Sequence, residues 1–181
     1  MADGTSLGPP RGLLHLVISG APAPEGLPAL VRLCQAGGWQ VAVISTPTGL
    51  EFTDPAELEA LTGSPVRSRH REPGTARGHQ ADAVLACPLT FTSVNKLAQG
   101  IADNMALGLL CEAAGYGIPV TVVPHCKPQL ASHPAFGASL DVLRGMGVRV
   151  MFDPAAPYDR RMPPWADVVA ALPIATGARR V

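Results

Sequence analysis

The sequence predicts an α/β fold in which a parallel sheet is covered by helices on both faces. Short, nearly continuous runs of Val, Ile, Leu and Ala recur along the chain, as is typical of strands that are buried on both faces. Stretches with helical spacing or capping signals separate these runs. Regular alternation of strand and helix favours parallel strands joined by right-handed crossovers. A length of 181 residues without internal repeats suits one domain over residues 1–181.

Five apolar runs are expected to form the strands of this sheet. They are short, rich in β-branched or small apolar residues, and bounded by polar or turn-forming residues. The five runs are residues 13–18, 40–45, 83–87, 120–123 and 148–152.

Five further segments carry helix signals. Residues 28–36 place their leucines on one side of a helix. Asp54 followed by Pro55 is a typical helix start, since a capping side chain precedes a proline at the first helical position. The longest segment, residues 93–114, is expected to be one uninterrupted helix. The last two expected helices are residues 134–146 and 164–172.

Polar segments rich in Gly and Pro are expected to lie outside the regular elements. Residues 67–80 and 153–163 predict loops that are functional or mobile. Residues 1–12 and 174–181 are expected to be flexible tails.

Composition limits the classes of partner. Apolar residues make up 47% of the chain and charged residues 15%, so we expect apolar surface that faces other subunits. The formal net charge is zero, which gives no basic excess for nucleic-acid binding. The first apolar run is too short to span a membrane, and the residues before it do not resemble a signal peptide. The four cysteines form no CxxC pair, which disfavours zinc and favours a reducing, cytoplasmic setting.

Hydroxyl side chains follow three of the predicted strands. Ser19 and Gly20 follow the first, and Thr46 follows the second. Thr90, Thr92 and Ser93 follow the third, just before the long predicted helix. Ligands of such folds bind at the carboxyl ends of strands, where hydroxyls and backbone N–H groups hold phosphate. Each of the first two turns alone is equally typical of an ordinary tight turn, but together they favour an anion site.

Asp103 and Asn104 are unusual because they fall within the apolar segment expected to be one helix. A buried carboxylate is costly unless it is paired. Lys96, two helical turns earlier, is a candidate partner within that helix.

Residues 88–104, PLTFTSVNKLAQGIADN, resemble the PASANTIxKxAxGIxDN signature of the homo-oligomeric flavin-containing cysteine decarboxylases. Leu89, Phe91 and Thr92 depart from the signature, and Thr90, Ser93 and Val94 are conservative replacements. The segments SGAPAPEGLPALVRL and VISTPTGLEFTDPAELEAL resemble the first two strand-turn-helix units of the family. The positions identical to the signature are Pro88, Lys96, Ala98, Gly100, Ile101, Asp103 and Asn104.

The resemblance implies a Rossmann-like (flavodoxin-like) three-layer sandwich and a flavin bound between subunits. The flavin is FMN in most of the family, with FAD possible, and the assembly is a homotrimer or a homododecamer. The implied reaction is oxidative decarboxylation of a cysteine carboxylate, with the peptidyl-cysteine enzymes of lanthipeptide biosynthesis as the nearest type. The flavin would then contact Ser19, Gly20, Thr46, Phe52, Pro88, Thr90, Thr92, Ser93 and Asp103.

The resemblance weakens where the family holds its substrate. The segment PHCKPQLA stands where the family has PxMNxxMW, so Cys126 and Lys127 replace Met and the carboxylate-binding Asn. His125, Cys126 and Lys127 are the candidate substrate contacts, with Lys127 as a point charge for the carboxylate. The position of the catalytic histidine is Gly74, so His70 is the preferred candidate base, with His79 or no histidine as alternatives.

Several functions stay open on these residues. The preferred one is decarboxylation of the C-terminal cysteine of a ribosomal peptide to an aminoenethiol. Alternatives are a phosphopantothenoylcysteine decarboxylase, a flavin prenyltransferase-like enzyme, or a non-catalytic flavin-binding regulatory subunit, which the altered PHCK segment favours.

Overall fold

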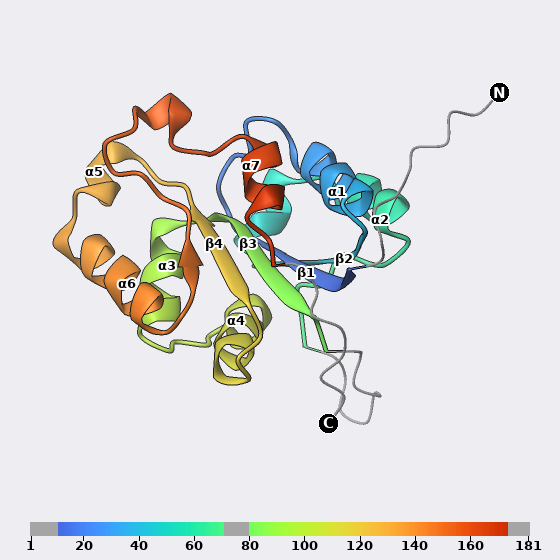
Figure 1. The fold of residues 1–181 in the computed structure, drawn as a ribbon, viewed down its shortest axis with the longest axis horizontal. Coiled ribbons are helices and arrows are strands. Elements are labelled where there is room, and N and C mark those ends of the chain that lie inside the picture. Colours follow the sequence, from blue (N-terminus) through green and yellow to red (C-terminus); the bar gives the residue numbers. More distant parts are fainter. Residues whose placement is uncertain (1–10, 71–79, 174–181) are drawn as a thin grey trace.

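The computed structural model describes residues 11–70 and 80–173, and its centre is a parallel sheet (Figure 1). The strand order is β2-β1-β3-β4-β5, with every neighbouring pair parallel. This is the flavodoxin-like order, so the predicted α/β class and Rossmann-like topology are confirmed. The strands are β1 (Gly12–Ile18), β2 (Trp39–Ser45), β3 (Ala83–Leu89), β4 (Val120–Pro124) and β5 (Arg149–Val150).

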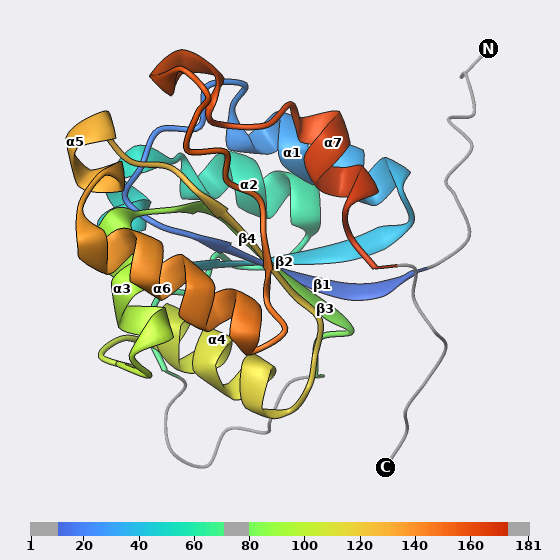
Figure 2. The ribbon, with the colours of Figure 1, turned by 60° about the vertical axis from the view of Figure 1, so that its left-hand side comes forward.

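Helices cover both faces of the sheet and make the three layers visible in Figure 2. One face carries α1, α2 and α7, and the other carries α3, α4 and α6. The α-helices are α1 (Leu27–Ala36), α2 (Pro55–Thr62), α3 (Phe91–Ala98), α4 (Met105–Gly115), α5 (Pro128–Ala131), α6 (Pro134–Gly145) and α7 (Trp165–Ala170). Two short 3-10 helices, η1 (Thr48–Phe52) and η2 (Tyr158–Arg160), complete the described elements.

The prediction of one long helix over residues 93–114 is wrong, because the chain forms two helices, α3 and α4, with a break between them. Gly100 has φ of 70°, and the N–H of Ile101 donates to the carbonyl of Lys96 at 2.8 Å. That bond and the left-handed glycine form a Schellman motif, which ends a helix. Asn104 then starts α4 by accepting the N–H of Leu107 at 3.1 Å. Asp103 and Asn104 therefore lie between helices.

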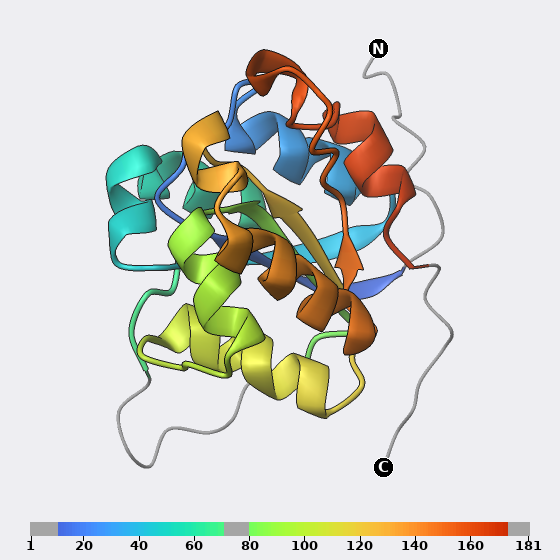
Figure 3. The ribbon, with the colours of Figure 1, turned by 90° about the vertical axis from the view of Figure 1, so that its left-hand side faces the viewer.

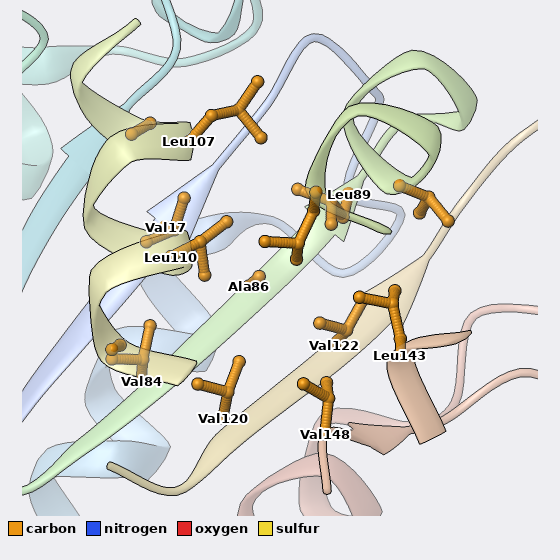
Figure 4. Close-up of a cluster of buried hydrophobic side chains, with 14 of the residues drawn as sticks. Val17, Val84, Ala86, Leu89, Leu107, Leu110, Val120, Val122, Leu143 and Val148 are labelled. Atoms are coloured by element: carbon orange, nitrogen blue, oxygen red, sulfur yellow. The ribbon is translucent and has the colours of Figure 1, made fainter. Parts of the chain in front are cut away.

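The core consists of two apolar layers on either side of the sheet. Figure 4 shows the α3–α4–α6 side, where Leu110 of α4 lies next to Val17 of β1. Leu143 of α6 lies over β4 beside Val148 in the same view. Each fully buried Leu stabilises the fold by about 1.5–3 kcal/mol relative to exposure. This packing on both faces explains the nearly continuous apolar sequence of the strands.

A short extension lies outside β2. The N–H of Arg67 donates to the carbonyl of Val43 at 3.0 Å, and the N–H of Ser45 donates to the carbonyl of Arg67 at 2.7 Å. Arg67 and Ile44 thus form a parallel bridge that continues the sheet beyond its edge strand. In the described part of the chain, no helix combines the length and apolarity needed to cross a membrane.

Candidate active site at the carboxyl edge of the sheet

The segments that follow β2, β3 and β4 gather at one edge of the sheet, the side that faces the viewer in Figure 3. β1 and β3 are neighbours in the sheet, and the chain leaves them toward opposite faces, to α1 and to α3. This is the topological switch point, where ligands of doubly wound folds bind. Ser19 follows β1, and Thr90 follows β3, so the predicted hydroxyl turns meet at that point.

Ser19 links the two strands directly. Its hydroxyl donates to the carbonyl of Pro88 at 2.9 Å and accepts the N–H of Thr90 at 2.9 Å. Its own N–H donates to the same carbonyl at 3.1 Å. Ser19 is 2% exposed, and the only hydrogen of its hydroxyl is already donated. Ser19 therefore positions the turn after β3, and a phosphate here would need other donors.

Gly20 allows the turn after β1 to approach the segment after β2. A Cβ atom at Gly20 would lie 2.7 Å from Cγ2 of Thr48 and 3.5 Å from Cε2 of Phe52. Real Cβ atoms essentially never make contacts under 3.0 Å, so any other residue here would force Thr48 to shift. Phe52 is 50% exposed although it is aromatic. The expected Ser19, Gly20 and Phe52 thus lie at one place, with an apolar ring at its rim.

Thr46 shapes the turn after β2. Its Oγ1 accepts the N–H of Gly49 at 3.1 Å, and Thr46 is 6% exposed. Within residues 11–70 and 80–173 its own hydroxyl hydrogen is donated to no acceptor. The hydroxyl of the exposed Thr48 likewise makes no hydrogen bond with the described residues. Both threonines therefore keep a donor for an anion.

A second hydroxyl group begins α3. Thr90 is the N-cap, and its Oγ1 accepts the N–H of Ser93 at 3.2 Å while donating to Oγ of Ser93 at 3.0 Å. The relay ends on Ser93, which is 7% exposed and retains its own hydrogen as a donor. Thr92 is exposed, and Pro88 lies in the fully buried β3 after a cis peptide bond. The pair Thr90–Ser93 can thus present one donor to a polar ligand edge.

Asp103 is one member of a polar chain that joins α3 to α4. Nζ of Lys96 donates to Oδ2 of Asp103, and Nδ2 of Asn104 donates to Oδ1 of Asp103 at 3.0 Å. The hydrogen bond from Lys96 is the main cause that holds the pKa of Asp103 below its usual value. The partner expected within a helix is the correct one, but the pair spans the break between α3 and α4.

His125 and Cys126 follow β4 and are almost fully buried, with exposed fractions of 6% and 7%. The N–H of His125 donates to the carbonyl of Leu89 at 2.9 Å, which holds this segment against β3. The imidazole stacks on the ring of Tyr158 from η2, with ring centroids 5.1 Å apart. Burial, then the charge of Arg161, lowers the pKa of His125. Lys127, by contrast, is exposed and precedes α5.

Tyr158 and Arg161 were not expected from the sequence. The segment that follows β5 brings them over the end of β4, where η2 lies above α5 in Figures 1 and 2. Burial raises the pKa of the Cys126 thiol, and the charge of Arg161 opposes that rise. Residues 153–163 were expected to be a functional or mobile loop, and no local signal marked these two side chains.

His70 is exposed and lies at the opposite side of the sheet, three residues after the Arg67 bridge. Four strand spacings of ~4.8 Å separate Arg67 from β4, which amounts to about 19 Å. Three residues of chain span at most about 11 Å. Within one chain the backbones of His70 and His125 therefore lie at least about 8 Å apart. The alternative His79 and the Gly74 position lie outside the described residues.

The two remaining histidines have structural roles. Nδ1 of His133 accepts the N–H of Ala135 at 3.1 Å and caps α6. His15 lies within β1, and burial followed by the charge of Arg67 lowers its pKa to about 4.

Known proteins of similar structure share this architecture. A structure described as the FMN-dependent cysteine decarboxylase TvaF from thioviridamide biosynthesis is 26% identical, with a TM-score of 0.67 over 83% of this chain and 93% of that chain. The epidermin biosynthesis protein EpiD from Staphylococcus aureus shares the fold at 17% identity, with a TM-score of 0.70 over 88% of this chain and 99% of that chain.

Sequence relatives give a consistent result. The Escherichia coli (strain K12) coenzyme A biosynthesis bifunctional protein CoaBC is 30% identical over 142 residues, which is 75% of this chain and 34% of that protein. The chain thus spans about a third of the length of the curated relatives that it matches. The Flavoprotein family model matches residues 7–174, nearly the whole chain. With this match over the sheet, the hydroxyl turns and the segment after β5, the chain belongs to the Flavoprotein family.

Proposed function

We propose that this protein binds FMN at the carboxyl edge of its sheet and uses it to decarboxylate a compound that ends in cysteine. The observation that carries the proposal is the set of hydroxyl donors at the switch point between β1 and β3, in a chain of the Flavoprotein family. The likeness to TvaF, described as an FMN-dependent cysteine decarboxylase, supports both the cofactor and the reaction. FAD is the alternative cofactor.

In this proposal, different residues of the site contact different parts of the flavin. Thr46 and Thr48 offer free hydroxyls to the phosphate, and Gly20 permits the close approach of the two turns. Thr90 and Ser93 offer a donor to the polar edge of the ring system, and Phe52 offers apolar contact. Ser19 acts by fixing Thr90, and Asp103 acts by fixing the start of α4 next to α3. Pro88 and Thr92 complete the proposed contacts.

A bound flavin supplies the hydride acceptor that oxidation of the cysteine side chain requires. Loss of carbon dioxide from the resulting thioaldehyde then leaves an enethiol. The protein must hold the thiol and the carboxylate in place, and it must take the thiol proton. We assign the proton to His70 of one subunit, while His125, Cys126 and Lys127 contact the substrate from another. The distance between His70 and His125 within one chain supports this division between subunits.

The assembly implied is a homo-oligomer, either a trimer or a dodecamer built from four trimers. Several large apolar side chains are exposed on the single chain, which supports burial against other copies. They include Phe52 at the proposed flavin site, Ile101 between α3 and α4, and Leu130 of α5.

The substrate class we favour is a ribosomal peptide with a C-terminal cysteine, such as a lanthipeptide precursor. The likeness to TvaF, described as a cysteine decarboxylase, over 93% of that chain supports a substrate that ends in cysteine. Phosphopantothenoylcysteine is the second candidate, which the identity of 30% to the E. coli coenzyme A protein favours.

Mass spectrometry distinguishes these substrates. The FMN-saturated protein is incubated with peptides that end in cysteine, with the same peptides ending in serine, and with phosphopantothenoylcysteine. Loss of two hydrogens and one carbon dioxide from the cysteine peptides alone supports the peptide reaction. Loss from phosphopantothenoylcysteine alone supports the second candidate. No loss from either refutes the proposed reaction and leaves a flavin-binding protein without this activity.

A further inference from the structure

Two buried nitrogen atoms next to the end of β4 have no hydrogen-bond partner within residues 11–70 and 80–173. They are Nδ1 of His125 and Nη1 of Arg161. His125 is 6% exposed, so its ring is held in the protein and has little access to water. An unsatisfied buried polar atom costs about 1–3 kcal/mol. Two such atoms in one region indicate a position that a ligand satisfies.

The guanidinium of Arg161 is fixed in orientation. Its Nε–H donates to the carbonyl of Ala156 at 3.1 Å, and its Cζ lies 5.7 Å from the ring centroid of Phe152. Among the described residues it forms no salt bridge with a carboxylate. A positive charge that is held by a carbonyl and a ring, yet unpaired, attracts an anion.

The imidazole of His125 is fixed from two sides. Its backbone N–H is bonded to Leu89, and its ring stacks on Tyr158, which η2 supplies together with the neighbouring Arg161. The backbone N–H of Arg161 donates to the carbonyl of Tyr158 at 3.4 Å, so the ring that stacks on His125 belongs to the same short segment as Arg161. Burial, then the charge of Arg161, keeps the pKa of His125 low and the ring neutral. In the Nδ1–H tautomer the ring offers one further donor.

We propose that Arg161 and His125 together bind the carboxylate of the substrate. A planar guanidinium and one imidazole N–H are donors of the kind that carboxylates accept, and an unsubstituted phosphate would have more oxygens than these donors satisfy. Cys126, the next residue after His125, is buried as well, so this position has little access to water. The recognised group would be the carboxylate next to the thiol of the substrate. This assignment rests on the proposed function, and it gives Arg161, rather than the exposed Lys127, the main charge contact.

Isothermal titration of the full chain with 3-mercaptopropionate tests the assignment without turnover. This small molecule carries one thiol and one carboxylate, and 2-mercaptoethanol is the matched molecule without the carboxylate. We expect saturable binding of the acid alone. Arg161→Met should weaken it about tenfold or more, since a hydrogen bond to a charged group contributes about 1.5–3 kcal/mol. Arg160→Met, at the exposed neighbouring arginine of η2, should leave it unchanged.

Three results would overturn the assignment: no saturable binding by the parent, equal binding of 2-mercaptoethanol, or binding by Arg161→Met within twofold of the parent. If Arg161→Met fails to fold by circular dichroism, Arg161→Lys takes its place. Lysine keeps the positive charge but not the planar guanidinium, so binding should weaken severalfold, and unchanged binding would refute the role of the guanidinium. Binding that depends on Arg161 without any decarboxylation would refute the proposed function but support the carboxylate site. Full turnover by Arg161→Met would support the proposed function but refute the carboxylate site.

Discussion

The hydroxyl of Ser19 donates to the carbonyl of Pro88 at 2.9 Å and so joins the ends of β1 and β3. The same oxygen accepts the N–H of Thr90. The turn that carries the Thr90–Ser93 donor is therefore held by a residue from a different strand. We expect order at the proposed flavin site to depend on this link, because it joins two turns that are 69 to 71 residues apart in the sequence.

Ser19→Ala should lower the free energy of unfolding by about 1–3 kcal/mol, because it leaves the half-buried N–H of Thr90 without its acceptor and removes one of the two hydrogen bonds to the carbonyl of Pro88. Urea-induced unfolding measures this change. Ser132→Ala is the control, since Ser132 is exposed and bonds only to Gln129, and we expect a change within about 0.5 kcal/mol. Equal midpoints for Ser19→Ala and the parent would show that the link contributes nothing.

Gly20→Ala should raise the dissociation constant for FMN about tenfold, because the new methyl group would collide with Thr48 and push the two turns apart. Fluorescence quenching of FMN measures the constant. Gly137→Ala is the matched control: its Cβ meets nothing within 4 Å in the exposed middle of α6, so the helix should gain up to about 1 kcal/mol with FMN binding unchanged. The prediction fails if both alanines bind FMN alike.

Asn104→Ala should destabilise the protein by about 1 kcal/mol through loss of the α4 N-cap. Asn104→Ser keeps an oxygen that can accept the N–H of Leu107, and it should recover most of the loss. Thermal unfolding of the two variants side by side separates the cap from the bond to Asp103. If Ser and Ala are equally destabilising, the link to Asp103 rather than the cap is what matters.

His15 should make the protein less stable in acid. Its pKa is lowered from 6.5 to about 4 in the folded chain, so the unfolded chain binds a proton first as the pH falls through this window. The stability contribution is therefore complete above pH 6.5 and is lost toward pH 4, by at most about 1.4 kcal/mol per pH unit. Partial exposure of the ring reduces that slope.

The test of His15 is the pH dependence of urea unfolding between pH 4 and 7 for the parent and for His15→Leu. The variant should lose stability less steeply with acid than the parent. His133→Asn, which keeps a capping side chain at the exposed start of α6, should follow the parent. Parallel curves for the parent and His15→Leu would show that the ring titrates normally.

The strands could be predicted from the sequence because burial on both faces leaves a continuous apolar run, as in Ala83–Leu89. The break between α3 and α4 was missed because the apolar content of residues 93–114 outweighed its signals. Those signals were present: Gly100 ends one helix and Asn104 caps the next.

The candidate site, like the fold, could be predicted only in part. The hydroxyl turns could be predicted because parallel strands bring their carboxyl ends to one edge. The contact of Tyr158 and Arg161 with the segment after β4 could not, because it depends on where the chain runs after the two-residue strand β5. No local sequence pattern predicts the course of the chain after β5. The donor of Ser19 could not be judged either, since its acceptor lies 69 residues away.

Titration of the purified, flavin-stripped protein with FMN tests the central claim most directly, namely that this edge of the sheet is a flavin site. Saturable quenching of FMN fluorescence with one FMN per chain is the predicted result. Thr46→Val should weaken it, because the free hydroxyl at the turn after β2 is lost while the shape of the side chain is kept. Absence of saturable binding of both FMN and FAD by the folded parent protein would contradict the account.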